Sequence, residues 1–147
     1  MTTTFPRSKM ISASTFLLTL LLCASTIAQA QQKPEQLGQQ SAESWLALVD
    51  SRKYADSWDE AAQLFKSAVT KDQWLDAVGK ARTPQGKVLS RKLKSATYTK
   101  TLPNAPDGEY VVIQYDTDFE HKAGATETIV PMLDKDGKWR VSGYFIK

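Results

Sequence analysis

The apolar residues of this chain change their spacing at Gly86, and this change constrains the fold more than any other feature. Before Gly86 they recur every three or four positions, which predicts helices with one buried face. After Gly86 they alternate with polar residues, which predicts strands with one buried face. Helices followed by a run of strands indicate an α+β domain with an antiparallel sheet, because βαβ units would alternate the two kinds of element.

Two or three amphipathic helices are predicted before Gly86. Thr70 and Gln73 form a capping box that opens the last of them, and Pro84 stops it. We expect Trp58 to be buried against the sheet, because the same helix face carries other apolar side chains. The apolar positions are Ala42, Trp45, Leu46 and Val49, then Tyr54, Trp58, Ala61, Ala62 and Phe65, then Trp74, Leu75 and Val78.

Four strands are predicted after Gly86, in an antiparallel meander covered by the helices on one face. Pro131 has no backbone N–H to donate, so it predicts an edge or a bulge within its strand. The strands are expected over residues 87–102, 110–120, 126–133 and 138–147, with turns at 103–108, 122–124 and 134–137. The last strand is expected to place three side chains on one side, namely Trp139, Val141 and Phe145.

The first thirty residues have the three-part layout of a secretory signal peptide. Arg7 and Lys9 precede a strongly apolar stretch at 16–22, and small residues stand at Ala28 and Ala30. We predict cleavage after Ala30 and a periplasmic or secreted product. The predicted signal peptide therefore covers residues 1–30.

Two alternatives to cleavage remain open. A retained membrane helix would need about 20 predominantly apolar residues, whereas the strongly apolar stretch covers only 16–22. A lipid anchor would use Cys23, but Leu22 occupies the position where lipoprotein processing prefers a small residue. Cleavage after Ala30 therefore remains our prediction, with no stable membrane span afterwards.

Cleavage would leave 117 of the 147 residues, a normal length for one domain. We expect a flexible lead-in at 31–40, rich in Gln, and a single domain at 41–147. Removing two of the 19 basic residues leaves 17 against 16 acidic ones. A nearly neutral domain lacks the broad basic face of a nucleic-acid binder, so we exclude that class of partner.

An acidic row at Asp116, Asp118 and Glu120 suggests two interpretations. One is a hard cation held by carboxylate oxygens. The other is a solvated strand face opposite the basic residues at 91–94, in cross-strand pairs. We favour the second because side chains in one row diverge along a strand. We therefore predict no metal site and no cofactor.

No catalytic residue is predicted. His121, the single histidine, falls at an expected hairpin turn, and the chain has no Gly-x-Ser-x-Gly motif. The aromatic side chains suggest either a core or the wall of a ligand pocket. If a pocket exists, we expect its wall to include three aromatic residues, Tyr115, Phe119 and Trp139.

Several segments together resemble DUF4019, a family of exported bacterial proteins of unknown function. They are residues 44–50, 54–58, 82–86, Arg91, 106–112, Glu127 and 137–144. The order of elements and the closing 136–141 strand also resemble NTF2-like and cystatin-like cone-shaped α+β domains. That resemblance implies a pocket between sheet and helices, but no functional residue is carried over from either group.

We therefore expect an exported, non-catalytic domain that binds a small apolar ligand or an envelope protein. The alternative is a small NTF2-like enzyme, an isomerase or hydrolase that uses a pocket carboxylate. A third hypothesis is an interaction domain that uses an exposed sheet edge. An acid or His121 beside the aromatic residues in a cavity would favour the enzyme.

Overall fold

The computed structural model describes Met1, Thr2 and residues 32–147. The predicted signal peptide and its cleavage after Ala30 lie outside these described residues. The described residues 32–147 lie within a single unit. Of the helices described, none is both long and apolar enough to span a bilayer.

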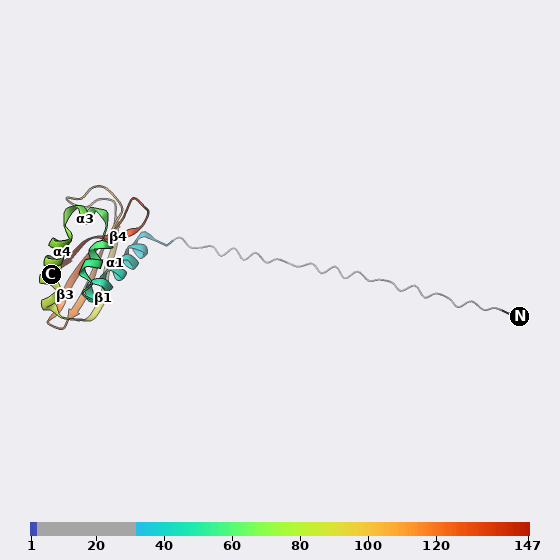
Figure 1. Cartoon of the computed structure of the whole chain (residues 1–147), viewed down its shortest axis with the longest axis horizontal. Coiled ribbons are helices and arrows are strands. Elements are labelled where there is room, and N and C mark those ends of the chain that lie inside the picture. The colour runs from blue at the N-terminus through green and yellow to red at the C-terminus, as the bar shows by residue number, and fades with distance from the viewer. Residues whose placement is uncertain (3–31) are drawn as a thin grey trace. The chain divides into compact units, whose positions relative to one another are not determined.

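The described part of the chain contains four α-helices and a 3₁₀ helix, followed by four strands (Figure 1). The helices are α1 (Pro34–Asp50), α2 (Tyr54–Asp59), α3 (Gln63–Ala68), α4 (Lys71–Arg82) and η1 (Thr83–Gln85). The strands are β1 (Val88–Thr99), β2 (Tyr110–Phe119), β3 (Lys122–Leu133) and β4 (Trp139–Ile146). They form one antiparallel sheet in the order β1-β2-β3-β4, which confirms the predicted α+β class and meander.

Helix α1 begins at Pro34, eight residues before the predicted start at Ala42. Residues 34–40, expected to be part of a flexible lead-in, are therefore helical. Pro34 stands at the first helical turn, where its missing N–H costs nothing. Gly38 in the next turn is buried against the sheet, so packing extends the helix beyond its obvious apolar stripe.

Gly38 marks the closest approach of α1 to the sheet. A Cβ at this position would stand 2.7 Å from Val111 Cβ and Cγ2, closer than side chains tolerate. We therefore predict that Gly38→Ala lowers the free energy of unfolding by about 1–3 kcal/mol, through overpacking. Gly79 in α4 is the matched control, because a Cβ there meets nothing within 4 Å.

Gly79→Ala should raise the free energy of unfolding by about 0.5–1 kcal/mol, the difference in helix propensity. Urea unfolding of both variants measures the two effects. A stabilised Gly38→Ala protein would contradict the close packing of α1 on Val111.

The second predicted helix is divided into α2 and α3 by a turn at 60–62. Ala61 and Ala62 are fully buried in this turn, and the Ala62 N–H donates to the Val141 carbonyl at 2.8 Å. Small side chains thus allow the turn to approach the free edge of β4. The break also redirects Trp58, which is half-buried beside α3 and donates to the Val69 carbonyl at 2.8 Å. Trp58 packs against the core but is only partly buried, so the expected burial of Trp58 against the sheet is confirmed only in part.

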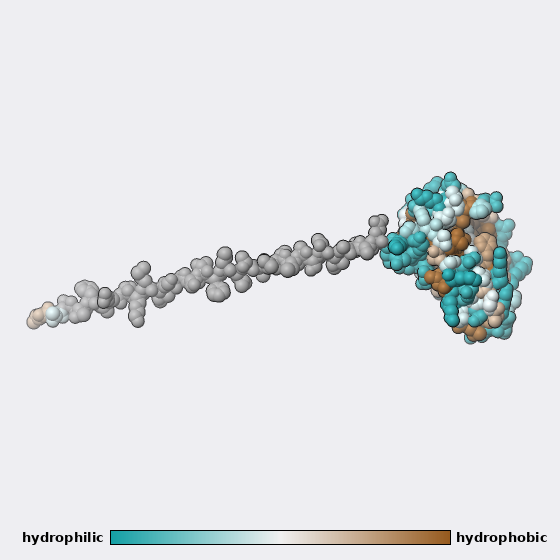
Figure 2. All heavy atoms as spheres, turned by 180° about the vertical axis from the view of Figure 1, so that it is seen from behind, coloured by the Kyte–Doolittle hydropathy of each residue, from teal (hydrophilic) through white to brown (hydrophobic). Residues whose placement is uncertain are grey.

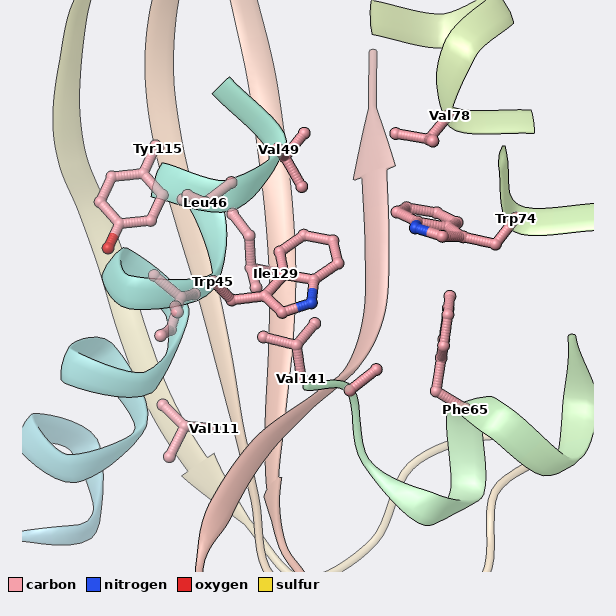
Figure 3. Close-up of a cluster of buried hydrophobic side chains, with 13 residues drawn as sticks. Trp45, Leu46, Val49, Phe65, Trp74, Val78, Val111, Tyr115, Ile129 and Val141 are labelled. Carbon is pink, nitrogen blue, oxygen red and sulfur yellow. The ribbon is translucent and has the colours of Figure 1, made fainter. Parts of the chain in front are cut away.

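The core lies between α1 and the inner face of the sheet (Figure 3). Trp45, Leu46 and Val49 extend from α1 toward Ile129 and Val141 on the strands. Trp74 and Phe65, from α4 and α3, complete the core and pack edge to face with centroids 5.2 Å apart. The predicted apolar faces of these helices are confirmed.

A β-bulge between β3 and β4 changes which residues of β4 face the core. Pro131 pairs with Val141 while Val130 pairs with Gly143, so Ser142 is the extra residue. The bulge predicted for Pro131 is confirmed, although β3 is a central strand. Because alternation shifts by one residue, Phe145 points outward and is 59% exposed. The prediction that it shares the side of Val141 is therefore wrong.

Viewed from behind, the domain shows apolar patches among hydrophilic residues (Figure 2).

Candidate functional site

Two features of the domain qualify as candidate sites, and the first is a network of buried charges. Glu127 in β3 is fully buried, and both its carboxylate oxygens accept hydrogen bonds. Thr117 and Arg91 Nε donate to Oε2, each at 2.7 Å. Tyr144 donates to Oε1 at 2.6 Å, and Arg91 Nη2 at 3.2 Å. Every acceptor direction of this carboxylate is thus occupied by the protein.

Asp50 at the end of α1 connects this network to the helices. It accepts two hydrogen bonds from Arg91, at 2.7 and 3.1 Å, and one from Arg82 Nη2 at 2.9 Å. Arg82 is 4% exposed and stacks on the ring of Phe119, with 4.4 Å from Cζ to the centroid. The network therefore balances two cations with two anions, as burial of charge requires. We call it the buried charge network: Asp50, Arg82, Arg91, Thr117, Glu127 and Tyr144.

The environment keeps Arg91 charged and the Tyr144 hydroxyl protonated. Burial alone would lower the pKa of Arg91, but hydrogen bonds to Asp50 and Glu127 outweigh it and raise the pKa. Burial, together with the Glu127 charge, raises the pKa of Tyr144, so its hydroxyl remains a donor. The network connects six elements, namely α1, α4, β1, β2, β3 and β4, and Glu127 has no free oxygen with which to accept a substrate proton.

The second feature is an open groove between the first turns of α1 and the end of the sheet at the β3–β4 hairpin. Its volume is about 880 Å³. We call it the α1–β4 groove. Its apolar lining consists of Pro34, Leu37, Trp45, Leu48, Leu133, Trp139 and Val141. Its polar lining consists of Gln32, Gln40, Ser41, Ser44, Glu60, Glu109, Lys138 and Arg140, with Gly137 at the hairpin.

Strand pairing brings together the residues that form the floor of the groove. Trp139 in β4 pairs with Leu133 in β3, whose N–H donates to the Glu109 carbonyl at 2.9 Å. Glu109, Leu133 and Trp139 therefore lie side by side across the sheet. Ser41 of α1 donates to the Trp139 carbonyl at 2.9 Å and joins the helix to this floor.

The three predicted wall residues are separated in the structure. Trp139 is half-buried and lines the groove. Tyr115 is 4% exposed beneath α1, where burial raises its pKa to about 12. Phe119 is buried under Arg82. All three share the inner face of the sheet, but α1 covers its middle and leaves only the Trp139 end open.

The acidic row lies on the outer face of β2 and its following turn, opposite Tyr115 and Phe119, as predicted. Asp116 pairs with Lys94 at 3.2 Å. Hydrogen bonds from the Gly124 N–H and from Ser90 lower the pKa of Asp118. Among the described residues, no group of acidic, His or Cys side chains is arranged to hold a metal ion. His121 is exposed at the turn between β2 and β3, as expected.

Sequence reasoning missed the buried charge network and the acidic members of the groove. Arg91 was grouped with exposed basic residues, yet it pairs with Thr117 and faces inward. One signal was available: Glu127 stands two residues from Ala125 and Ile129, at an inward position of an alternating strand. A charged residue at such a position indicates a buried partner.

Comparison with known proteins identifies a family. A family model described as "Protein of unknown function (DUF4019)" matches residues 41–144, which confirms the resemblance seen in the sequence. No curated protein and no solved structure matches the chain. The resemblance to NTF2-like domains therefore stays a prediction.

Proposed function

The chain belongs to the DUF4019 family, and we propose that it is an exported, non-catalytic binding domain that holds a small apolar ligand in the α1–β4 groove. The observation that carries this proposal is the half-buried Trp139 on the groove floor, beside Leu133. Ligand sites are concave and mostly apolar, with a few polar groups around them. The groove combines an apolar floor with Ser and Gln side chains from α1.

The buried charge network and His121 supply no catalytic group to the groove, which supports binding. Catalysis at neutral pH needs a positioned acid, base, nucleophile or metal near the bound substrate. Glu127 already accepts four hydrogen bonds within the buried charge network, whose members do not line the groove. His121 is exposed at a turn.

A blocking variant tests the groove as the binding site. Ser44 is an exposed groove residue of α1 whose hydroxyl donates to the Gln40 carbonyl one turn earlier. Ser44→Phe should fill the groove without disturbing the core. Ser67 on α3 is the matched control, since it is exposed, lies away from the groove and donates to Gln63 in the same way.

The readout is a thermal-shift screen of apolar envelope metabolites and lipids against the exported protein. A ligand specific to the folded state raises the melting temperature by mass action. We expect Ser44→Phe to abolish the shift and Ser67→Phe to preserve it. A ligand that stabilises both variants equally binds elsewhere and refutes the assignment to the groove.

Export itself has a direct test. The layout of residues 1–30 predicts that the exported protein begins at Gln31 in the periplasm. Intact-mass analysis of the periplasmic fraction should give the mass of residues 31–147. An uncleaved chain, or diacylglycerol on Cys23, would show that one of the two alternatives holds.

One observation favours the enzyme alternative. Glu109 brings a carboxylate into the groove beside Leu133 and Trp139, which is the arrangement that a pocket acid would need. An isomerase or hydrolase of this kind would lose its turnover in Glu109→Gln while still binding substrate. A turnover that depends on Glu109 would replace the binding proposal.

A further inference from the structure

We propose that the ligand of the α1–β4 groove carries a protonated amine and that Glu109 binds this amine; this inference rests on the function proposed above. The ligand class is thus a cationic amphiphile, with an alkyl or aryl body on the groove floor and a primary ammonium at the Glu109 end.

Glu109 is held in position from two directions. It directly precedes β2, and its backbone carbonyl accepts a hydrogen bond from the Leu133 N–H at 2.9 Å. Its side-chain Oε1 accepts a hydrogen bond from the Tyr98 hydroxyl at 3.1 Å. The residue is half-buried. The carboxylate is therefore oriented before any ligand arrives, which reduces the entropy lost on binding.

Glu109 has no cationic partner of its own. It forms no ion pair with any described Lys or Arg, although eight such pairs occur elsewhere in the described part of the chain. Arg140 lines the groove but binds Asp134 at 3.0 Å and Asp136 at 2.8 Å. A half-buried carboxylate without a counter-charge favours a ligand that supplies one.

The other charged residues of the groove also favour a cationic ligand. Glu60 adds a second carboxylate beside the free edge of β4, where the turn before α3 meets Val141. Lys138 offers the opposing charge, at an exposed position of the β3–β4 hairpin. With Arg140 neutralised by its two Asp partners, the carboxylates of Glu60 and Glu109 outnumber the ammonium of Lys138 among the described residues of the groove.

The floor next to Glu109 accounts for the apolar part of the ligand. Leu133 and Trp139 follow Glu109 across the sheet, so an amine at the carboxylate directs its substituent over these two side chains. A charge-assisted hydrogen bond at one end and apolar contact along the rest would fix the orientation of the ligand.

Three eight-carbon probes separate charge from apolar burial: octylamine, 1-octanol and octanoate. Each is titrated into the ¹⁵N-labelled exported protein, and the Trp139 indole signal reports on the groove. We expect octylamine to bind about tenfold more tightly than octanol, which corresponds to about 1.4 kcal/mol. We expect octanoate to bind most weakly, and the preference for octylamine to decline as salt is added.

Glu109→Gln should remove the preference for octylamine and leave the affinity for octanol unchanged. The amide oxygen still accepts from Tyr98, so the fold is preserved. Asp76→Asn is the matched control, because Asp76 is an exposed acid on α4, paired with Lys80 at 2.7 Å, outside the groove. It should leave all three affinities unchanged.

Each other outcome is decisive. Equal affinities for octylamine and octanol would overturn the amine while leaving groove binding intact. A preference for octylamine that survives in Glu109→Gln would overturn the role of Glu109. Tightest binding of octanoate would reverse the sign of the recognised charge and point to Lys138. Failure of all three probes to shift the Trp139 signal would count against the proposed function itself.

Discussion

Replacing Glu127 by alanine is expected to lower the free energy of unfolding by about 3–5 kcal/mol, the cost of breaking a buried ion pair. The variant leaves Arg91 with Asp50 as its one charged partner and removes the acceptor of Thr117 and Tyr144. Because Glu127 is fully buried, water does not replace these contacts. Urea unfolding, followed by far-UV circular dichroism, measures the loss.

The matched control is Asp116→Ala on the opposite face of the sheet. Asp116 and its partner Lys94 have side chains 58% and 52% exposed, so their pair contributes about 0–1 kcal/mol. A loss below about 1 kcal/mol in Glu127→Ala would show that the buried network is as weak as a surface pair.

A double variant separates charge pairing from packing. Glu127→Leu combined with Arg91→Met removes both charges, and apolar pairs of similar volume are often tolerated in place of buried ion pairs. We expect the double variant to be less destabilised than Glu127→Leu alone, because no unpaired guanidinium remains. Additive losses would mean that Arg91 and Glu127 do not interact.

The sequence predicted the elements of this fold well because their patterns are local. Thr70 accepts from the Gln73 N–H at 3.3 Å and the Gln73 side chain accepts in return, which is the predicted capping box. The turn at 134–137 and the alternation of β2 are likewise set by neighbouring residues. In each case the determining residues stand within a few positions of one another.

The predictions that failed depended on contacts between distant segments. The start of α1 depends on Gly38 meeting Val111, and the break after α2 depends on Ala62 meeting Val141. The direction of Phe145 depends on a bulge that strand pairing creates at Ser142. Alternation alone counts residues along one strand and does not register that one of them has no counterpart in the partner strand.

The candidate site was hardest to predict for the same reason. The buried charge network draws Asp50 from α1, Arg82 from α4, Arg91 from β1 and Glu127 from β3. The groove exists because α1 covers Tyr115 but leaves Trp139 partly open. Both features follow from how the layers are stacked, and the spacing of residues along the chain does not encode that stacking directly.

Trp45→Ala is expected to lower the free energy of unfolding by about 3–5 kcal/mol, as large aromatic truncations in cores do. Trp45 is 3% exposed and packs against Trp74 and Tyr144, with centroids 5.6 and 5.4 Å away. Its indole N–H donates to the Ser57 carbonyl at 2.7 Å, so the variant also leaves a buried acceptor without its donor.

Trp58→Ala provides the matched comparison within the same domain. Trp58 is half-buried, and its indole donates to the Val69 carbonyl while Lys66 and Lys71 approach its ring at 5.8 and 5.6 Å. Less apolar area leaves water on folding, so we expect a loss of about 1–2 kcal/mol. Equal losses in the two variants, measured by urea unfolding, would contradict the difference in burial between Trp45 and Trp58, because a half-buried side chain would then contribute as much to stability as a buried one.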